Sequence, residues 1–313
     1  MRTMKSLVSI VLAAALTLLV APGAQAATLP VPYNLAPGVT QQLLAADSPP
    51  PGANNWSCRP SSGHPEPVIL THGLGANQTV NWQTYSPLLA NNGYCVFTLT
   101  YGAPATGVPI YQPAGLAPME QSAAQLSAFV DKVLAATGAA KVDILGHSEG
   151  TLMPSYYVKF LGGASKVDKY VSLTPLWDGT TLLGLSNLYQ FVSGLGLRPV
   201  VDGVLNPVCG SCAEFLHGSD FLGKLHSGNG IFQPGVTYTN IVTRYDELVS
   251  PYTSGLGTGP NVTNIVLQDT CGLDFAEHLG LAADRNAAGH VLNALDPAHA
   301  KPVPCSPATP LGS

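Results

Sequence analysis

The chain contains the segment Lys141-Val142-Asp143-Ile144-Leu145-Gly146-His147-Ser148-Glu149-Gly150, a short apolar run followed by a Gly-x-Ser-x-Gly turn. Residues 151–158 continue in a helical pattern, so the turn joins a strand to a helix. Its two glycines permit a turn so tight that the serine hydroxyl stands clear of the backbone. Free N–H groups and the positive end of the helix dipole lie there, where an oxyanion would form. This context makes Ser148 a candidate nucleophile; the alternative is a glycine-rich turn with an idle serine.

Apolar runs of strand length alternate with helical patterns along most of the chain. We expect strands at residues 68–71, 94–100, 141–145, 167–174, 236–243 and 262–267. We expect helices at residues 82–91, 118–136, 151–158 and 281–295. The alternation predicts an α/β fold with a mostly parallel, doubly wound sheet that has helices on both faces. It lapses at residues 177–233, where an apolar, glycine-punctuated stretch is expected to form a cap or lid insertion. Ordinary packed helices and loops are the alternative there.

The first 26 residues have the pattern of a secretory signal peptide. Arg2 and Lys5 precede an apolar run at residues 7–20, and Ala24-Gln25-Ala26 fits a signal-peptidase site. We therefore expect a secreted protein in which residues 27–313 form one domain and residues 27–66 wrap the core. Removal of Arg2 and Lys5 changes the formal charge from −5 to −7. This acidic balance gives no support for a nucleic-acid partner.

Six cysteines lie in the expected mature part of the chain. An even number in an exported protein indicates three disulfides, although the sequence alone leaves the pairing open. Pairing of neighbours in chain order is favoured, which joins Cys58 to Cys95, Cys209 to Cys212 and Cys271 to Cys305. The motif Cys209-Gly210-Ser211-Cys212, with His217 and His226 downstream, is also compatible with a zinc site, which is less usual in an exported protein.

A serine hydroxyl needs a general base, usually a histidine that is oriented by a carboxylate. In a sheet with this turn, the acid and the base follow the serine in the order Ser, Asp, His, each beyond a strand. Asp246 follows the strand expected at 236–243 and His278 follows the last strand, so these are the candidate acid and base. Asp178, beyond the strand at 167–174, is the rival acid. The remaining histidines have no comparable position: His64, His147, His217, His226, His290 and His299.

Two backbone N–H groups are expected to form an oxyanion hole. One belongs to Glu149, directly after the serine, and the other to Leu74, in the loop that follows the first strand. The Glu149 side chain itself has two interpretations. It either caps local N–H groups at the helix N-terminus, or it carries a charge that raises the pKa of His278.

These motifs resemble the α/β-hydrolase superfamily, and more closely the secreted actinobacterial class 2 triacylglycerol lipases. The similar stretches extend through most of the chain and are Thr71-His72-Gly73-Leu74, Asn92-Gly93-Tyr94-Cys95-Val96-Phe97, Gly146-His147-Ser148, residues 156–163, residues 218–222, residues 243–252 and Glu277-His278-Leu279. The resemblance implies the α/β-hydrolase fold and an extracellular carboxylic-ester hydrolase with Ser148, Asp246 and His278 as its catalytic triad. Similarity to the fungal lipase B type also supports the pair Cys58–Cys95.

Two parts of the chain depart from the family pattern, the elbow and the stretch Leu176-Trp177-Asp178, which replaces a more polar one. Where the pattern is Gly-His-Ser-Gln-Gly-Gly, this chain has Glu149 and Thr151. After the fourth strand, Trp177 is a candidate for the acyl or alcohol pocket, with an ordinary packing role as the alternative. These departures bear on the substrate rather than on the class of reaction.

The reaction implied is hydrolysis of a small-molecule or lipid ester through an acyl-enzyme, with no cofactor and no metal. Transient contact with a lipid interface is expected. Polyester hydrolysis, and acyl transfer to an alcohol, are alternatives that use the same triad. A non-catalytic secreted binding protein is the more distant alternative.

Overall fold

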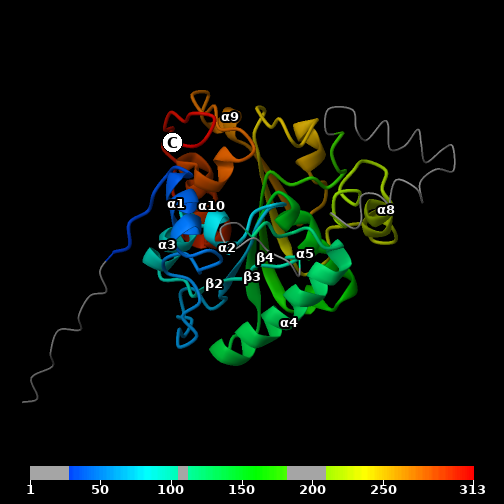
Figure 1. Cartoon of the computed structure of the whole chain (residues 1–313), viewed down its shortest axis with the longest axis horizontal. Coiled ribbons are helices and arrows are strands. Elements are labelled where there is room, and N and C mark those ends of the chain that lie inside the picture. The colour runs from blue at the N-terminus through cyan, green and yellow to red at the C-terminus, as the bar shows by residue number, and fades with distance from the viewer. Residues whose placement is uncertain (1–27, 105–111, 182–208) are drawn as a thin grey trace, which may run out of the picture.

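The core of the protein is a sheet of six parallel strands in the order β2-β1-β3-β4-β5-β6 (Figure 1). The computed structural model describes residues 28–104, 112–181 and 209–313. Within these residues the strands are β1 (Val68–Thr71), β2 (Val96–Thr98), β3 (Val142–His147), β4 (Val167–Leu173), β5 (Thr237–Val242) and β6 (Val262–Val266). The predicted parallel sheet is therefore confirmed. Because all strands are parallel, the loops that follow them meet at one edge of the sheet.

Helices cover both faces of this sheet, as the apolar strands require. The helices of the described residues are α1 (Ala36–Leu44), α2 (Gln78–Asn81), α3 (Tyr85–Asn91), α4 (Met119–Thr137), α5 (Glu149–Phe160), α8 (Asp220–His226), α9 (Leu267–Thr270) and α10 (Arg285–Leu295). Figure 1 shows α4 and α5 on one side of the sheet and α3 and α10 on the other. Alternate residues of a strand point to opposite faces. Ile69 accordingly packs in the cluster with α4 and α5, and Val68 and Leu70 pack in the cluster with α3 and α10.

Several element boundaries differ from the prediction. The strand expected at 94–100 is limited to β2, and beyond its end the Thr100 hydroxyl accepts the Gln78 N–H at 3.1 Å. The helix expected at 82–91 begins at Tyr85. The helix expected at 281–295 begins only at Arg285, because Asp284 caps it by accepting the Ala287 N–H at 2.7 Å. Residues 280–283 form a 3₁₀ turn instead.

The segment before β1 lies against the α3 side of the domain. Leu29 and Asn91 exchange two hydrogen bonds of 2.8 Å, and the Thr84 hydroxyl donates to the Pro32 carbonyl at 2.5 Å. Three disulfides hold the chain at other points, and they are the pairs that join neighbours in chain order: Cys58–Cys95, Cys209–Cys212 and Cys271–Cys305. Because Cys209 and Cys212 are bonded to each other, this structure leaves no thiolate there for zinc.

Some predictions concern residues that the structure does not describe. The expected signal peptide at residues 1–26 and residues 182–208 of the expected cap both lie outside the described ranges. The described remainder of the 177–233 stretch includes the short helix α8. In the described part of the chain, no helix has the length and apolar character needed to cross a membrane.

The turn between β3 and α5 places Ser148 in a strained backbone conformation. Ser148 has φ 55° and ψ −126°, a region that L-residues rarely adopt. The flanking glycines permit the close approach that holds it there. A Cβ on Gly146 would lie 2.2 Å from the Gly150 carbonyl oxygen, and a Cβ on Gly150 would lie 2.0 Å from the Thr71 carbonyl oxygen. The Gly-x-Ser-x-Gly pattern is thus required by backbone packing on both sides of the serine.

We expect relief of this strain to be measurable as stability. Ser148→Gly should have a free energy of unfolding about 1 kcal/mol higher than Ser148→Ala, because glycine adopts a positive φ without steric cost. The two variants both lack the hydroxyl, so chemical denaturation of the pair isolates the backbone effect. Equal midpoints for the two variants would show that the conformation of Ser148 carries no strain.

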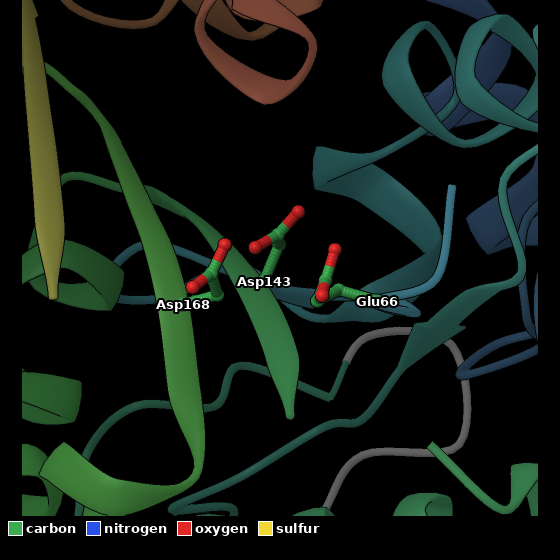
Figure 2. Close-up of side chains that lie close together, drawn as sticks. All are labelled: Glu66, Asp143 and Asp168. Carbon is green, nitrogen blue, oxygen red and sulfur yellow. The ribbon is translucent and has the colours of Figure 1, made fainter. Parts of the chain in front are cut away.

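An acidic cluster lies at the edge of the sheet opposite Ser148. Figure 2 shows Asp143 of β3 between Asp168 of β4 and Glu66, which precedes β1. One carboxylate oxygen from each lies within 4.8 Å of the others. The ammonium group of Lys169 lies 2.9 Å from Asp168, 3.6 Å from Asp143 and 3.7 Å from Glu66. This lysine supplies a positive charge to all three carboxyl groups, so the cluster is an ion-pair network of the fold.

Burial makes Asp143 a pH-dependent member of this network. Loss of solvation raises the pKa of Asp143 from 3.8 to about 8, although Lys169 opposes the shift. Between these two pH values the folded chain retains a proton that the unfolded chain has released. The free energy of unfolding contributed by Asp143 is therefore largest below about pH 4 and is lost as the pH rises through about 8.

Asp143→Asn should remove this dependence. Its amide oxygen can still accept the Lys169 N–H, which Asp143 accepts at 2.9 Å. Between about pH 5 and pH 8 the wild type should lose up to about 1.4 kcal/mol per pH unit relative to the variant. Denaturant unfolding across this range measures the difference, with Asp131→Asn, at an exposed ion pair with Lys166, as the control. Parallel curves for the wild type and Asp143→Asn would contradict the assignment.

Candidate active site

The loops that follow β3, β5 and β6 bring Ser148, Asp246 and His278 together. His278 Nε2 lies 2.8 Å from the Ser148 hydroxyl oxygen, and its Nδ1 lies 2.9 Å from both carboxylate oxygens of Asp246. The side chains of His278 and Asp246 are each only 2% exposed, so water does not compete for the bond between them. Ser148 is half-buried. This arrangement can transfer a proton from the serine to an imidazole that a carboxylate orients.

Backbone N–H groups hold the Asp246 carboxylate in place. Asp246 Oδ1 accepts the N–H of Leu248 at 3.0 Å and the N–H of Val249 at 2.7 Å. The neighbouring acid, Glu247, accepts the backbone N–H of His278 at 3.2 Å. The loop after β5 therefore fixes both the side chain and the backbone of His278.

The rival acid lies in a different ion pair. Asp178 Oδ1 lies 3.3 Å from His226 Nε2, and both side chains are about half exposed. The structure does not bring Asp178 to His278, which is already bonded to Asp246. The other histidines outside the site contact separate groups: His217 the Asp178 carbonyl, His64 the Tyr94 ring, His290 the Thr270 hydroxyl and His299 the Asp296 carboxylate.

A cavity of about 200 Å³ opens beside the Ser148 hydroxyl. Leu74 and Glu149, the two expected backbone donors, both line it. Within the described residues neither backbone N–H has a hydrogen-bond acceptor. The loop that carries Leu74 passes close to the serine, since a Cβ on Gly73 would lie 3.1 Å from Ser148 Cβ. Two free N–H groups at one cavity are available to bind an oxyanion.

Most of the cavity lining is apolar. Its large apolar members are Leu74, Leu176, Phe215, Leu248, Val249 and Leu279. Trp177, the sequence candidate for this pocket, is not among the lining residues. It is 1% exposed, packs edge-on against Tyr170 and Phe232, and donates its indole N–H to Asn240 at 3.1 Å. The structure therefore places Trp177 in the core, and its neighbour Leu176 faces the cavity instead.

His147 contributes to the site in a way that the sequence did not indicate. Its Nε2 lies 3.0 Å from the carbonyl oxygen of His278, and its Nδ1 lies 3.1 Å from Asn81 Oδ1. Burial, together with the nearby His278, lowers the pKa of His147 to about 3, so the ring is neutral at neutral pH. Both partners are acceptor oxygens, so the single proton of the neutral ring can be donated to only one of them at a time. His147 thus contacts the backbone of His278, and it lines the same cavity as Ser148.

His72 and Tyr101 support the loop that carries Leu74. Burial lowers the pKa of His72 to about 4, which makes this ring neutral as well. Its Nδ1 donates to the Gly73 carbonyl at 2.9 Å, and its Nε2 accepts the Tyr101 N–H at 3.2 Å. The Tyr101 ring stacks on His72 with centroids 4.2 Å apart, and its hydroxyl donates to the His72 carbonyl at 2.6 Å. These contacts fix the backbone immediately before Leu74.

The Glu149 side chain is buried without a counter-charge. It is 1% exposed, and burial raises its pKa well above the usual value, with the negative charge of Glu214 acting in the same direction. Burial therefore disfavours the charge that was expected to act on His278. The capping expectation is contradicted, since neither carboxyl oxygen has a hydrogen-bond partner in the described structure.

The chain resembles solved structures of lipases. Among solved structures, the chain resembles Aspergillus fumigatus lipase B with a TM-score of 0.61 and 19% identity, covering 83% of this chain and 58% of that chain. It thus spans somewhat more than half of the fungal lipase, and the likeness shows the fold. The mature form of Bacillus licheniformis lipase BlEst2 has a TM-score of 0.47 and 13% identity, covering 70% of this chain and 87% of that chain.

The chain also matches a known protein family over a long continuous range. Residues 65–282 match the family described as Lipase (class 2). The match includes β1, the Gly-x-Ser-x-Gly turn, Asp246 and His278, and so contains each of the loops that meet at the cavity. Because it extends over more than half of the chain, the protein belongs to the class 2 lipase family.

Proposed function

We propose that the protein is a secreted carboxylic-ester hydrolase that works through an acyl-enzyme on Ser148. The observation that carries this proposal is the hydrogen-bonded series from Ser148 through His278 to Asp246, beside an apolar cavity. Membership of the class 2 lipase family supports the same reaction. The three disulfides, and the signal-peptide pattern of the first residues, support secretion.

In the proposed first step, Ser148 attacks the carbonyl carbon of the ester. His278 Nε2, at 2.8 Å, accepts the hydroxyl proton as the new C–O bond forms. The Asp246 carboxylate stabilises the resulting imidazolium through Nδ1. When the tetrahedral intermediate collapses, His278 returns the proton to the departing alcohol and the acyl group remains on Ser148. Water then repeats the sequence and releases the acid.

The negative charge that develops on the carbonyl oxygen needs donors that are already in place. The N–H groups of Leu74 and Glu149 are proposed for this role, because both line the cavity and neither is bonded elsewhere within the described residues. The Glu149 N–H also lies at the N-terminus of α5, where the helix dipole favours a negative charge. Loss of one such donor typically slows catalysis by about a hundredfold or more.

The substrate proposed is an ester with an apolar acyl or alcohol part. Three leucines that line the cavity are also exposed to solvent: Leu74 at 36%, Leu248 at 39% and Leu279 at 48%. They place apolar surface around the entrance, where it can meet a lipid aggregate as well as a dissolved ester. Transient contact with a lipid interface is therefore part of the proposal.

A matched series of variants tests the mechanism on a short-chain nitrophenyl ester. Ser148→Ala should abolish hydrolysis, and Asp246→Asn should lower kcat about a thousandfold or more, because the imidazole loses its orienting carboxylate. Asp178→Asn is the control, since Asp178 contacts His226 on the surface. An Asp246→Asn rate equal to that of the control, or hydrolysis that survives in Ser148→Ala, would reject the mechanism.

A further inference from the structure

The carboxyl group of Glu149 lies directly behind the backbone of Leu74. The intervening residue is Gly115, which has φ 72°. A Cβ built on Gly115 would lie 2.9 Å from Glu149 Oε1 and 3.4 Å from Leu74 Cα. Any side chain at this position would therefore collide with the carboxyl group. The close approach brings the buried acid next to the loop that carries one of the two proposed oxyanion donors.

Hydrogen bonds connect the segment around Gly115 to that loop. The Gly75 N–H donates to the Ala114 carbonyl at 2.8 Å, and the Ala114 N–H donates to the Ala76 carbonyl at 3.0 Å. Gly115 itself donates its N–H to the Tyr101 carbonyl at 2.8 Å. Residues 114–115 are therefore hydrogen-bonded to the two residues that follow Leu74 or to the Tyr101 carbonyl.

The disulfide-closed loop at residues 209–212 holds the same segment from the other side. The Gly210 N–H donates to the Leu116 carbonyl at 2.6 Å, and the Ser211 hydroxyl donates to the Gly115 carbonyl at 2.6 Å. The disulfide between Cys209 and Cys212 closes this loop. The Glu149 carboxyl thus lies where three segments of the chain meet.

The polar groups that face Glu149 have no proton to give it. The hydroxyls of Ser211 and Tyr101 lie near its carboxyl group, where a proton donated by either would lower the pKa of Glu149. Each hydroxyl already donates its proton to a backbone carbonyl, Ser211 to Gly115 and Tyr101 to His72. Their oxygens can therefore only accept a further hydrogen bond. A carboxylate would have no donor here, whereas a carboxylic acid has one proton to give.

The surrounding ionisable groups do not oppose this preference, and burial raises the pKa of the neighbouring acid Glu214 as well, to about 8. Glu214, from the loop before α8, faces Glu149 and accepts the Met119 N–H at 2.6 Å. Behind Glu214 lie Glu120 of α4 and Lys224 of α8, which form an ion pair of 2.8 Å with each other. Among the described groups that act on Glu149, none is a lysine or an arginine.

We propose that the Glu149 side chain is a positioning residue that acts as a carboxylic acid: its carboxyl group, which has no hydrogen-bond partner in the described structure, turns to donate a hydrogen bond to the nearby Ser211 hydroxyl. This bond ties α5 to the 209–212 loop across Gly115, and so holds the Leu74 N–H toward the oxygen of the tetrahedral intermediate. The inference rests on the proposed function, because the orientation of Leu74 matters for the rate only if an oxyanion forms there.

Glutamine and methionine at position 149 separate this role from simple packing. Glu149→Gln keeps a neutral donor of the same shape, and Glu149→Met is an unbranched apolar side chain of similar length. We expect kcat on a soluble ester to be about tenfold or more higher in Glu149→Gln than in Glu149→Met, with KM values within about twofold of each other. Affinity for an alkyl trifluoromethyl ketone, which forms a charged tetrahedral adduct, should fall by a similar factor in Glu149→Met.

Stability should change in the opposite direction from activity. Glu149→Met should have a melting temperature no lower than that of Glu149→Gln, because an apolar side chain carries no desolvation cost at a buried site. The same pair of substitutions at Glu214, a half-buried acid that does not line the cavity, controls for a general effect of removing an acid. For that pair we expect a kcat ratio near one.

Three results would overturn the inference. Equal kcat values for Glu149→Gln and Glu149→Met would show that no donor is needed. A parallel fall of kcat and melting temperature in Glu149→Met would indicate a packing role. A kcat ratio for the Glu214 pair as large as that for the Glu149 pair would show that the effect is not specific to position 149. Each is distinct from failure of the proposed function, which hydrolysis by Ser148→Ala would reveal in an otherwise unmodified chain.

Discussion

The hydrogen bond between His278 Nε2 and the Ser148 hydroxyl is the contact on which the account of this protein depends. It joins residues that are 130 positions apart in the sequence. Two constraints produce it. The parallel sheet brings the loops after β3 and β6 to one edge, and the strained turn at Ser148 lifts the hydroxyl out of the backbone. The close packing of Gly146 and Gly150 against backbone carbonyls maintains that strained turn in the folded chain.

Much of the fold and of the candidate site could be predicted from the sequence, because each rests on a local pattern. Apolar runs alternating with helical patterns require a parallel sheet that is covered on both faces, and the sheet has this form. The candidate nucleophile, acid and base follow from their order and from their positions after strands. Ser148, Asp246 and His278 needed no knowledge of distant contacts, since a parallel sheet brings all such positions to one edge.

The features that could not be predicted depend on residues that are distant in the sequence. Burial raises the pKa of Glu149 and so disfavours the expected charge at the elbow, and the groups that act on it, Tyr101, Ser211 and Glu214, come from three other segments. Trp177 directly follows Leu176, which lines the cavity. Its indole N–H nevertheless donates to Asn240 on β5, and its side chain lies in the core. Packing of this kind has no sequence period and is visible only in three dimensions.

The most direct test of the central claim is a crystal structure of the protein after reaction with an alkyl fluorophosphonate. The account predicts phosphorus bonded to Ser148 Oγ. It also predicts one phosphoryl oxygen within about 2.7–3.1 Å of the N–H groups of Leu74 and Glu149. A protein that remains unmodified at Ser148 under conditions that label a known serine hydrolase would contradict the account. So would an adduct whose phosphoryl oxygen points away from both N–H groups.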